Sequence, residues 1–139
     1  MTPDEMDAVF DAFVRAHRAQ DVDGLLALFA EDAEYEVVGD IYGRRRGHES
    51  IRRRYEDAFD EFGENSLTVL RRAYGENLLV TESLMTATAI GTIFGVEGGG
   101  RTVEYRLMHL CEFSGGLIRR HCVWVDASEL FSQLLAPKE

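Results

Sequence analysis

Apolar residues recur at helical spacing near the start of the chain and again in its middle. Residues 2–5 (TPDE) form a typical helix start, with a capping threonine, a proline at the first helical position and a glutamate at the third. We therefore predict a long helix over residues 3–20, a short helix beginning at Asp21 and a third helix over residues 48–62. His17 ends the apolar stripe of the first helix, where it is either a satisfied core residue or a ligand contact.

Alternating apolar and polar residues predict strands in most of the remaining chain. The expected strands cover residues 34–38, 66–74, 78–90, 103–113 and 117–126. A last helix opens at Asp126 and ends before Pro137. Helices gathered early and antiparallel strands gathered late are typical of an α+β fold. We predict a single domain over residues 1–139, in which a curved, mixed, mostly antiparallel sheet wraps around the long first helix as a cone with an internal pocket.

The hairpin around Gly115-Gly116 carries most of the candidate chemistry. If both glycines form the loop, which needs positive φ at both positions, Ser114 pairs with Leu117 and the register follows. The resulting cross-strand pairs are His109 with Cys122, Leu107 with Trp124, and Tyr105 with Asp126. A mostly apolar face that also holds groups able to donate, accept and titrate is typical of a ligand-pocket wall.

The opposite face of this hairpin would expose four apolar side chains in a monomer. They are Met108, Leu110, Val123 and Val125. Apolar groups clustered on the outer face of a sheet indicate an interface, and isologous dimers are the commonest way to cover one. We therefore predict a homodimer formed through this face.

Composition excludes some classes of partner. The formal net charge is −10, and a nucleic-acid-binding protein needs a basic face, so we expect no nucleic acid. The arginine runs at 44–46 and 52–54 are either solvated and paired with the surplus acids, or a rim that attracts an anionic ligand. The sequence has neither a signal-peptide pattern nor an apolar run near ~20 residues, so we expect no membrane contact.

The chain has only two cysteines. Neither their number nor their spacing predicts a disulfide framework, and no Cys/His spacing indicates a metal site. We therefore expect a cytoplasmic protein in a reducing setting, with no bound metal.

Several local strings resemble those of a known superfamily. They are the segment at residues 21–33 (DVDGLLALFAEDA), the glycine-rich approach to Arg101, the segment at 113–118 (FSGGLI), and the closing Trp124-Val125-Asp126 with Leu130 and Gln133-Leu134. Together they resemble the nuclear transport factor 2-like superfamily and, within it, the SnoaL-like polyketide cyclases. The resemblance implies intramolecular aldol chemistry on a hydrophobic carbonyl compound, without metal or cofactor. It also implies that Asp126 is the acid/base, with His109 as its helper.

The ketosteroid isomerases of the same superfamily provide a second comparison. Their general-base aspartate would fall at Val37, their oxyanion-hole tyrosine at Phe13, and their oxyanion-hole aspartic acid near His109. Only a supporting tyrosine matches, at Tyr55. Without the base and the phenol donor, the resemblance does not extend to that proton shuttle.

The candidate site residues keep structural alternatives. Asp126 is either a raised, buried acid/base or only the cap of the last helix, and His109 is either a proton acceptor or a core histidine. The expected ligand contacts are Tyr35, Tyr55, Tyr105, Trp124, His17, Phe13 and Cys122. Two functions stay open, namely a cofactor-independent cyclase- or isomerase-type enzyme and a non-catalytic module that binds a small hydrophobic molecule.

Overall fold

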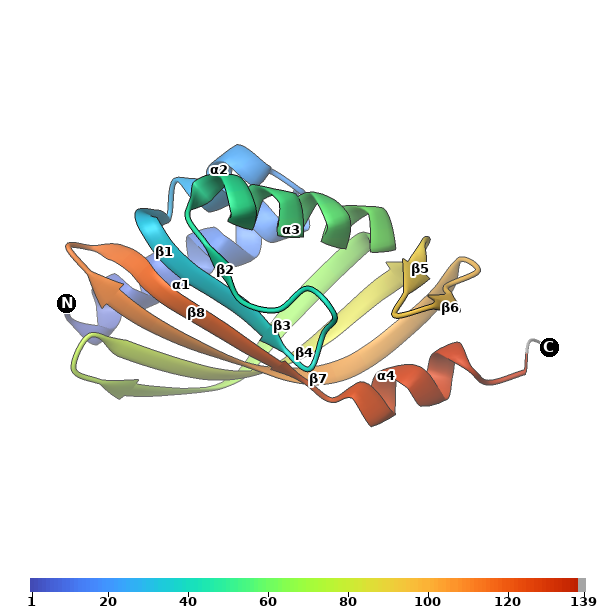
Figure 1. Ribbon diagram of the computed structural model, residues 1–139. Helices are drawn as coiled ribbons and strands as arrows, with labels where there is room; N and C mark the ends of the chain where they lie inside the picture. The colour runs from blue at the N-terminus through green and yellow to red at the C-terminus, as the bar shows by residue number, and fades with distance from the viewer. Residues whose placement is uncertain (138–139) are drawn as a thin grey trace.

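The computed structural model describes residues 1–137 and contains a six-stranded sheet that curves around a helix (Figure 1). The helices are α1 (Pro3–Arg18), α2 (Val22–Leu26), α3 (His48–Glu61) and α4 (Ala127–Leu134). The strands are β1 (Phe29–Val38), β2 (Arg45–Arg46), β3 (Phe62–Gly75), β4 (Leu78–Ala89), β5 (Thr92–Ile93), β6 (Val96–Glu97), β7 (Arg101–Ser114) and β8 (Leu117–Val125).

The sheet has the strand order β2-β1-β8-β7-β4-β3. Strand β1 runs parallel to β8, and every other pair in this sheet is antiparallel. Strands β5 and β6 form a separate two-stranded hairpin. These pairings confirm the predicted α+β class with a mixed, mostly antiparallel sheet.

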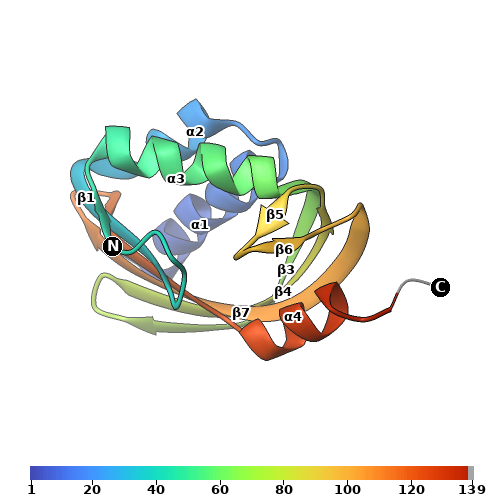
Figure 2. The same cartoon turned by 45° about the vertical axis from the view of Figure 1, so that its right-hand side comes forward.

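The core lies between the concave face of the sheet and α1, with α2 and α3 above β1 and α1 (Figure 2). Helix α1 begins as the sequence predicts, since Thr2 Oγ1 accepts from the Glu5 backbone N–H at 3.1 Å and the Glu5 carboxylate accepts from the Thr2 N–H at 3.0 Å. Its stripe of Met6, Phe10 and Phe13 is buried against the sheet. Among residues 1–137, no helix is long and apolar enough to cross a membrane.

The β7–β8 hairpin carries an irregularity that the alternation pattern did not predict. Ser114 pairs with Leu117 as expected, but Phe113 pairs with Ile118 while Glu112 pairs with Arg120. Arg119 is therefore an extra residue, a β-bulge, and it moves every later residue of β8 to the other face of the sheet.

The bulge makes three predicted cross-strand pairs wrong. His109 pairs with Val123 instead of Cys122, and Leu107 pairs with Val125 instead of Trp124. Asp126 follows the end of β8 and does not face Tyr105, because its backbone N–H donates to the Arg106 carbonyl at 2.9 Å.

Helix α4 covers the edge of β7 that β8 leaves unpaired. Gln133 accepts from the Glu104 N–H at 2.8 Å and donates to the Glu104 carbonyl at 2.6 Å. Glu129, one turn earlier on the same helix face, accepts from the Arg106 N–H at 2.9 Å. Side chains of α4 thus satisfy backbone groups that a strand would otherwise pair, which fixes the helix along this edge of the sheet.

Candidate functional site

A cavity of about 100 Å³ lies between the sheet, the C-terminal half of α3, the β5–β6 hairpin and α4. Its sheet-side wall is apolar and consists of Val37, Leu107, Val123 and Val125, while Ile93, Phe94 and Leu130 stand around its outer end. Three polar side chains also line it, namely Arg54, Glu61 and Tyr105. An apolar cavity with a few convergent polar groups is the usual form of a small-molecule site.

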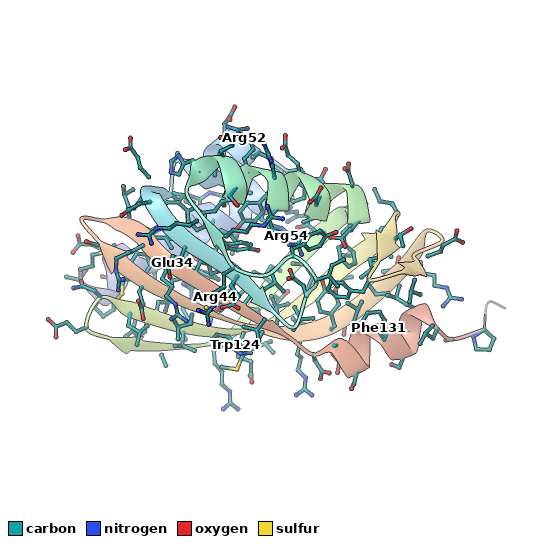
Figure 3. All side chains as sticks on the ribbon, in the orientation of Figure 1. Glu34, Arg44, Arg52, Arg54, Trp124 and Phe131 are labelled. Carbon is teal, nitrogen blue, oxygen red and sulfur yellow. The ribbon has the colours of Figure 1, made fainter. Side chains whose placement is uncertain are left out.

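A buried ion cluster stands at one side of this cavity. The Arg54 Nε donates to Asp40 Oδ2 at 3.1 Å, and the Arg54 Nη1 donates to Glu61 Oε1 at 3.3 Å. The three side chains are 8%, 1% and 7% exposed for Arg54, Asp40 and Glu61. The guanidinium also lies 4.4 Å from the ring centroid of Tyr42. Figure 3 shows Arg54 extending from α3 towards the sheet.

Local structure explains why these side chains meet. Asp40 Oδ1 accepts from the backbone N–H groups of Tyr42 and Gly43, so the turn after β1 holds its carboxylate in place. Arg54 and Glu61 are seven residues apart on α3 and therefore share one face of the helix. The Glu61 carbonyl accepts from the N–H groups of Ile90 and Gly91, which fixes the end of the helix against the end of β4.

The cluster places two carboxylates beside one guanidinium. Burial raises the pKa of Glu61 above its usual value, although the cation of Arg54 opposes the rise. Glu61 therefore holds a proton more easily than an exposed glutamate does.

Tyr105 adds a hydrogen-bond donor to the same cavity. Burial raises the pKa of its phenol, and the nearby carboxylate of Glu61 raises it further, so the group stays protonated. No hydrogen-bond partner of its hydroxyl group is found within residues 1–137. The hydroxyl is thus available to an acceptor inside the cavity.

Two imidazoles form a buried pair beside the apolar wall of the cavity. His109 Nδ1 lies 2.7 Å from His121 Nε2, and His109 pairs across β7 and β8 with Val123, which lines the cavity. Burial lowers the pKa of both rings, that of His121 to about 3, so both are neutral. The outer nitrogens, His109 Nε2 and His121 Nδ1, have no partner among the described residues.

Four of the predicted ligand contacts belong to the aromatic cluster that includes this histidine pair, and they do not line the cavity. Phe13 lies 5.6 Å and 5.0 Å from the ring centroids of His109 and His121, and Tyr35 lies 5.3 Å from His121. The Tyr55 ring lies tilted against the ring of Tyr35, with the ring centroids 5.0 Å apart. His17 contacts Asn65 Oδ1 through Nδ1 at 3.0 Å. These side chains build the aromatic core under α1, and of the predicted contacts Tyr105 lines the cavity.

The register shift turns Trp124 and Cys122 away from the concave face. Trp124 is 42% exposed on the convex side, where Figure 3 shows it below the sheet. Cys122 Sγ donates to Glu36 Oε1 at 3.8 Å, and burial raises its pKa, so the thiol is a weak nucleophile. The predicted pairing of Cys122 with His109 is wrong.

Asp126 caps α4 and lies outside the cavity. Its Oδ1 accepts from the Glu129 N–H at 3.0 Å, and its Oδ2 lies 3.7 Å from the Arg106 guanidinium on the convex side. The side chain is 34% exposed. Asp126 and His109 therefore do not share one face, and the predicted catalytic pair is not assembled.

Sequence reasoning did not identify Arg54 and Glu61 as site residues. Arg54 was grouped with its exposed neighbours in the run at 52–54, although it falls on the same helical stripe as Ile51 and Tyr55. The usable signal is a pair of opposite charges, seven residues apart, on the buried face of an amphipathic helix.

Comparison with known proteins relates this fold to others. A family model described as the SnoaL-like domain matches residues 10–121. The solved structure of TsrD from Streptomyces laurentii is 19% identical, with a TM-score of 0.84 and 99% of each chain covered. A putative SnoaL-like polyketide cyclase from Jannaschia sp. CCS1 is 14% identical, with a TM-score of 0.86 and 99% and 98% of the two chains covered.

A third structure extends the range of chemistry found on this fold. An LEH-like epoxide hydrolase from M. tuberculosis is 21% identical, with a TM-score of 0.75 and 94% and 90% of the two chains covered. No curated protein sequence matches the chain. At these identities the solved structures establish the shared fold and leave the chemistry to be argued from the site.

Proposed function

Because the chain belongs to the SnoaL-like domain family, we propose that it binds a small, mostly apolar carbonyl compound and performs acid/base chemistry on it without a cofactor. The observation that carries this proposal is the convergence of Arg54, Glu61 and Tyr105 on an otherwise apolar cavity. This site replaces the pair of Asp126 and His109 that the sequence predicted.

Each polar group has a distinct role in the proposed reaction. The Glu61 carboxylate takes a proton from the carbon next to the carbonyl group, and the released electron pair moves onto the carbonyl oxygen. The Tyr105 hydroxyl donates a hydrogen bond to the resulting enolate oxygen, and the cation of Arg54 stabilises its charge. Glu61 then returns the proton to carbon. Its raised pKa suits both steps, since a base poised nearer neutrality can also act as an acid.

Deuterium exchange into acetophenone tests this proposal without knowledge of the natural substrate. We expect the protein to accelerate exchange of the methyl protons in D₂O, followed by NMR. Glu61→Gln keeps the shape of the side chain and removes the base, so it should lower the rate of exchange by about 100-fold.

Asp126→Asn is the matched control, because asparagine also caps helices. It should leave the exchange rate unchanged, whereas equal losses in both variants would contradict the role of Glu61. If acetophenone binds and no exchange occurs above the buffer rate, the non-catalytic binding module is the better description. That alternative is favoured by the sealed position of His109 in the core.

We further propose that the chain forms a homodimer in the cytoplasm through the convex face of the sheet. Val123 and Val125 line the cavity on the concave side, so the predicted set of four residues was wrong in these two members. The exposed apolar strip instead runs across three neighbouring strands, because Val38 pairs with Trp124 and Trp124 pairs with Met108. Trp124 and Met108 are 42% and 44% exposed, and large apolar groups of this kind dominate interfaces. Free Cys111 and Cys122 are compatible with a reducing compartment.

Substitution of Trp124 by glutamate should dissociate the dimer. Loss of a central aromatic anchor raises a dissociation constant by about 30-fold or more, and sedimentation velocity at micromolar protein measures the change. Leu117→Glu, at an exposed apolar position at the start of β8 beside the turn, is the control and should leave the dimer intact. A wild-type mass near 15.7 kDa would contradict the dimer itself.

A further inference from the structure

The β5–β6 hairpin stands over the outer end of the cavity. Figures 1 and 2 both place it between the C-terminal end of α3 and α4. Ile93 and Phe94 line the cavity, and the Phe94 ring packs against Phe131 of α4 with the centroids 5.7 Å apart. The two aromatic rings thus join the hairpin to α4 at the wall of the cavity.

Phe94 holds a backbone conformation that a bulky residue seldom adopts. Its φ is 49°, and Gly95 after it has a φ of 83°. A two-residue hairpin turn needs positive φ at both positions, which glycine, asparagine or aspartate usually supplies. Such a conformation is strained in a residue with a side chain and persists where other contacts hold it. Here those contacts are the cavity wall and the ring of Phe131.

The base of the hairpin is fixed, so its tip is the part able to move. A Cβ atom on Gly91 would lie 2.4 Å from the Asp60 carbonyl oxygen, and one on Gly98 would lie 2.5 Å from the Ala89 carbonyl oxygen. Gly98 N–H also donates to the Gly91 carbonyl at 2.8 Å. The glycines therefore allow the base to pack directly against the ends of α3 and β4.

The cavity is small for the proposed ligands, so one of the elements around it has to move when they bind. Sites for drug-sized ligands usually measure about 300–1,000 Å³, and an engineered cavity of about 150 Å³ in another protein holds one benzene molecule. At about 100 Å³, the cavity as it stands is too small for a substituted aromatic carbonyl compound. Among the elements around it, the hairpin tip combines a strained turn with a position at the outer end.

We propose that the β5–β6 hairpin is a gate and that Phe94 sets the largest ligand that the cavity admits. The inference rests on the proposed binding of carbonyl compounds in this cavity. The gate opens when the Phe94 ring leaves Phe131, and the turn then relaxes from its strained conformation. A small ketone needs only a transient opening, whereas a larger one keeps the ring displaced while it is bound.

Two neutral ketones of different size test the gate. The small probe is acetone, which is smaller than benzene and whose binding is measured by NMR, and the large probe is 6-propionyl-2-dimethylaminonaphthalene, whose emission reports an apolar environment. Phe94→Gly removes the ring and is unstrained at this φ, so it should fold normally. We expect it to bind the large probe about tenfold more tightly than the wild type does, with a change below about twofold for acetone.

Two further variants separate the effect of the Phe94 ring on binding from the effect of the backbone conformation of the turn. Phe94→Asn removes the ring and tolerates positive φ, so it should behave like Phe94→Gly. Phe131→Leu weakens the contact from α4 and leaves the turn unchanged, so it should shift binding of the large probe in the same direction. Leu70→Ala, at an exposed apolar position on β3, is the control and should have no effect.

Binding kinetics provide a readout that a purely structural role would not change. With a gate, the observed association rate of the large probe in the wild type reaches a plateau as its concentration rises, and the plateau disappears in Phe94→Gly. Acetone binding with no change for the large probe in either Phe94 variant would overturn the gate while leaving the proposed function intact. Failure of both probes to bind to any variant would instead overturn the proposed function.

Discussion

Replacement of Arg54 by methionine is expected to lower the free energy of unfolding by about 3–5 kcal/mol. Methionine fills similar space but leaves Asp40 and Glu61 buried without their cation. Loss of one partner of a buried ion pair is far more costly than replacement of the whole cluster, because the remaining charge keeps its desolvation penalty. Urea denaturation at pH 7 measures the change.

Arg53→Met is the matched control, one residue away on the same helix. Arg53 pairs with Glu49 at 3.1 Å, but both side chains are exposed, so its loss should cost about 0.5 kcal/mol or less. A second test uses Glu61→Gln in the Arg54→Met background, which removes one of the stranded charges and should recover part of the lost stability. Equal costs for Arg53→Met and Arg54→Met would contradict the account of the cluster.

The pH dependence of the Arg54→Met variant has a definite sign. Without the guanidinium, nothing opposes the burial that raises the pKa of Glu61 in the folded state, so the folded variant binds more protons than the unfolded chain does. Its stability deficit should therefore shrink as the pH falls towards 4. A deficit that stays constant over this range would indicate lost packing instead of stranded charge.

The sequence predicted most of the elements because each one carries a strong local signal. The capping box of α1, the glycine pair of the β7–β8 turn and the alternation of β4 and β7 are all found as expected. The bulge at Arg119 is different, since a single extra residue reverses the faces of a strand without changing its composition. The observed burial of Ile118 and His121, three positions apart, is what breaks the alternation.

The candidate site was harder to predict for the same physical reason. Asp126 and Trp124 were placed in the pocket by a register that holds only for a regular hairpin. The sequence alone did not identify Arg54 and Glu61 as buried residues. Charged side chains are seldom buried without a partner, so a core-facing position on α3 predicts their burial only when the partner is known. That partner, Asp40, comes from a loop whose path the sequence does not specify. The sequence therefore predicts the strands themselves better than it predicts the long-range contacts of the polar residues.

The buried histidine pair should make the fold sensitive to mild acid. His109 and His121 are neutral in the folded state because burial lowers their pKa values, whereas an unfolded histidine titrates near ~6.5. Below that pH the unfolded chain binds more protons than the folded chain, so stability falls with the pH. For two such groups the loss between pH 7 and pH 5 is about 3–4 kcal/mol, and for His121 it continues until the pH reaches its folded value of about 3.

Two groups modify this dependence in opposite directions. Burial also lowers the pKa of His17, although its hydrogen bond to Asn65 opposes the shift, so His17 adds to the loss in acid. Glu61 has a raised pKa in the folded state and therefore stabilises the fold slightly as the pH falls. Because three buried histidines act against one carboxyl group, the net effect above pH 5 is destabilisation.

The variant His121→Phe isolates the contribution of the pair. The new ring keeps the aromatic contacts with Phe13 and Tyr35 and cannot bind a proton. Even if its stability at pH 7 is lower, because His109 Nδ1 loses its partner, the slope of unfolding free energy against pH should be smaller by about 1.4 kcal/mol per pH unit below pH 6. His48→Gln, which removes a histidine outside the core, serves as the control, with urea denaturation at several pH values as the measurement. An unchanged slope in His121→Phe would mean that His121 is protonated in the folded protein, and the neutral, hydrogen-bonded pair would have to be abandoned.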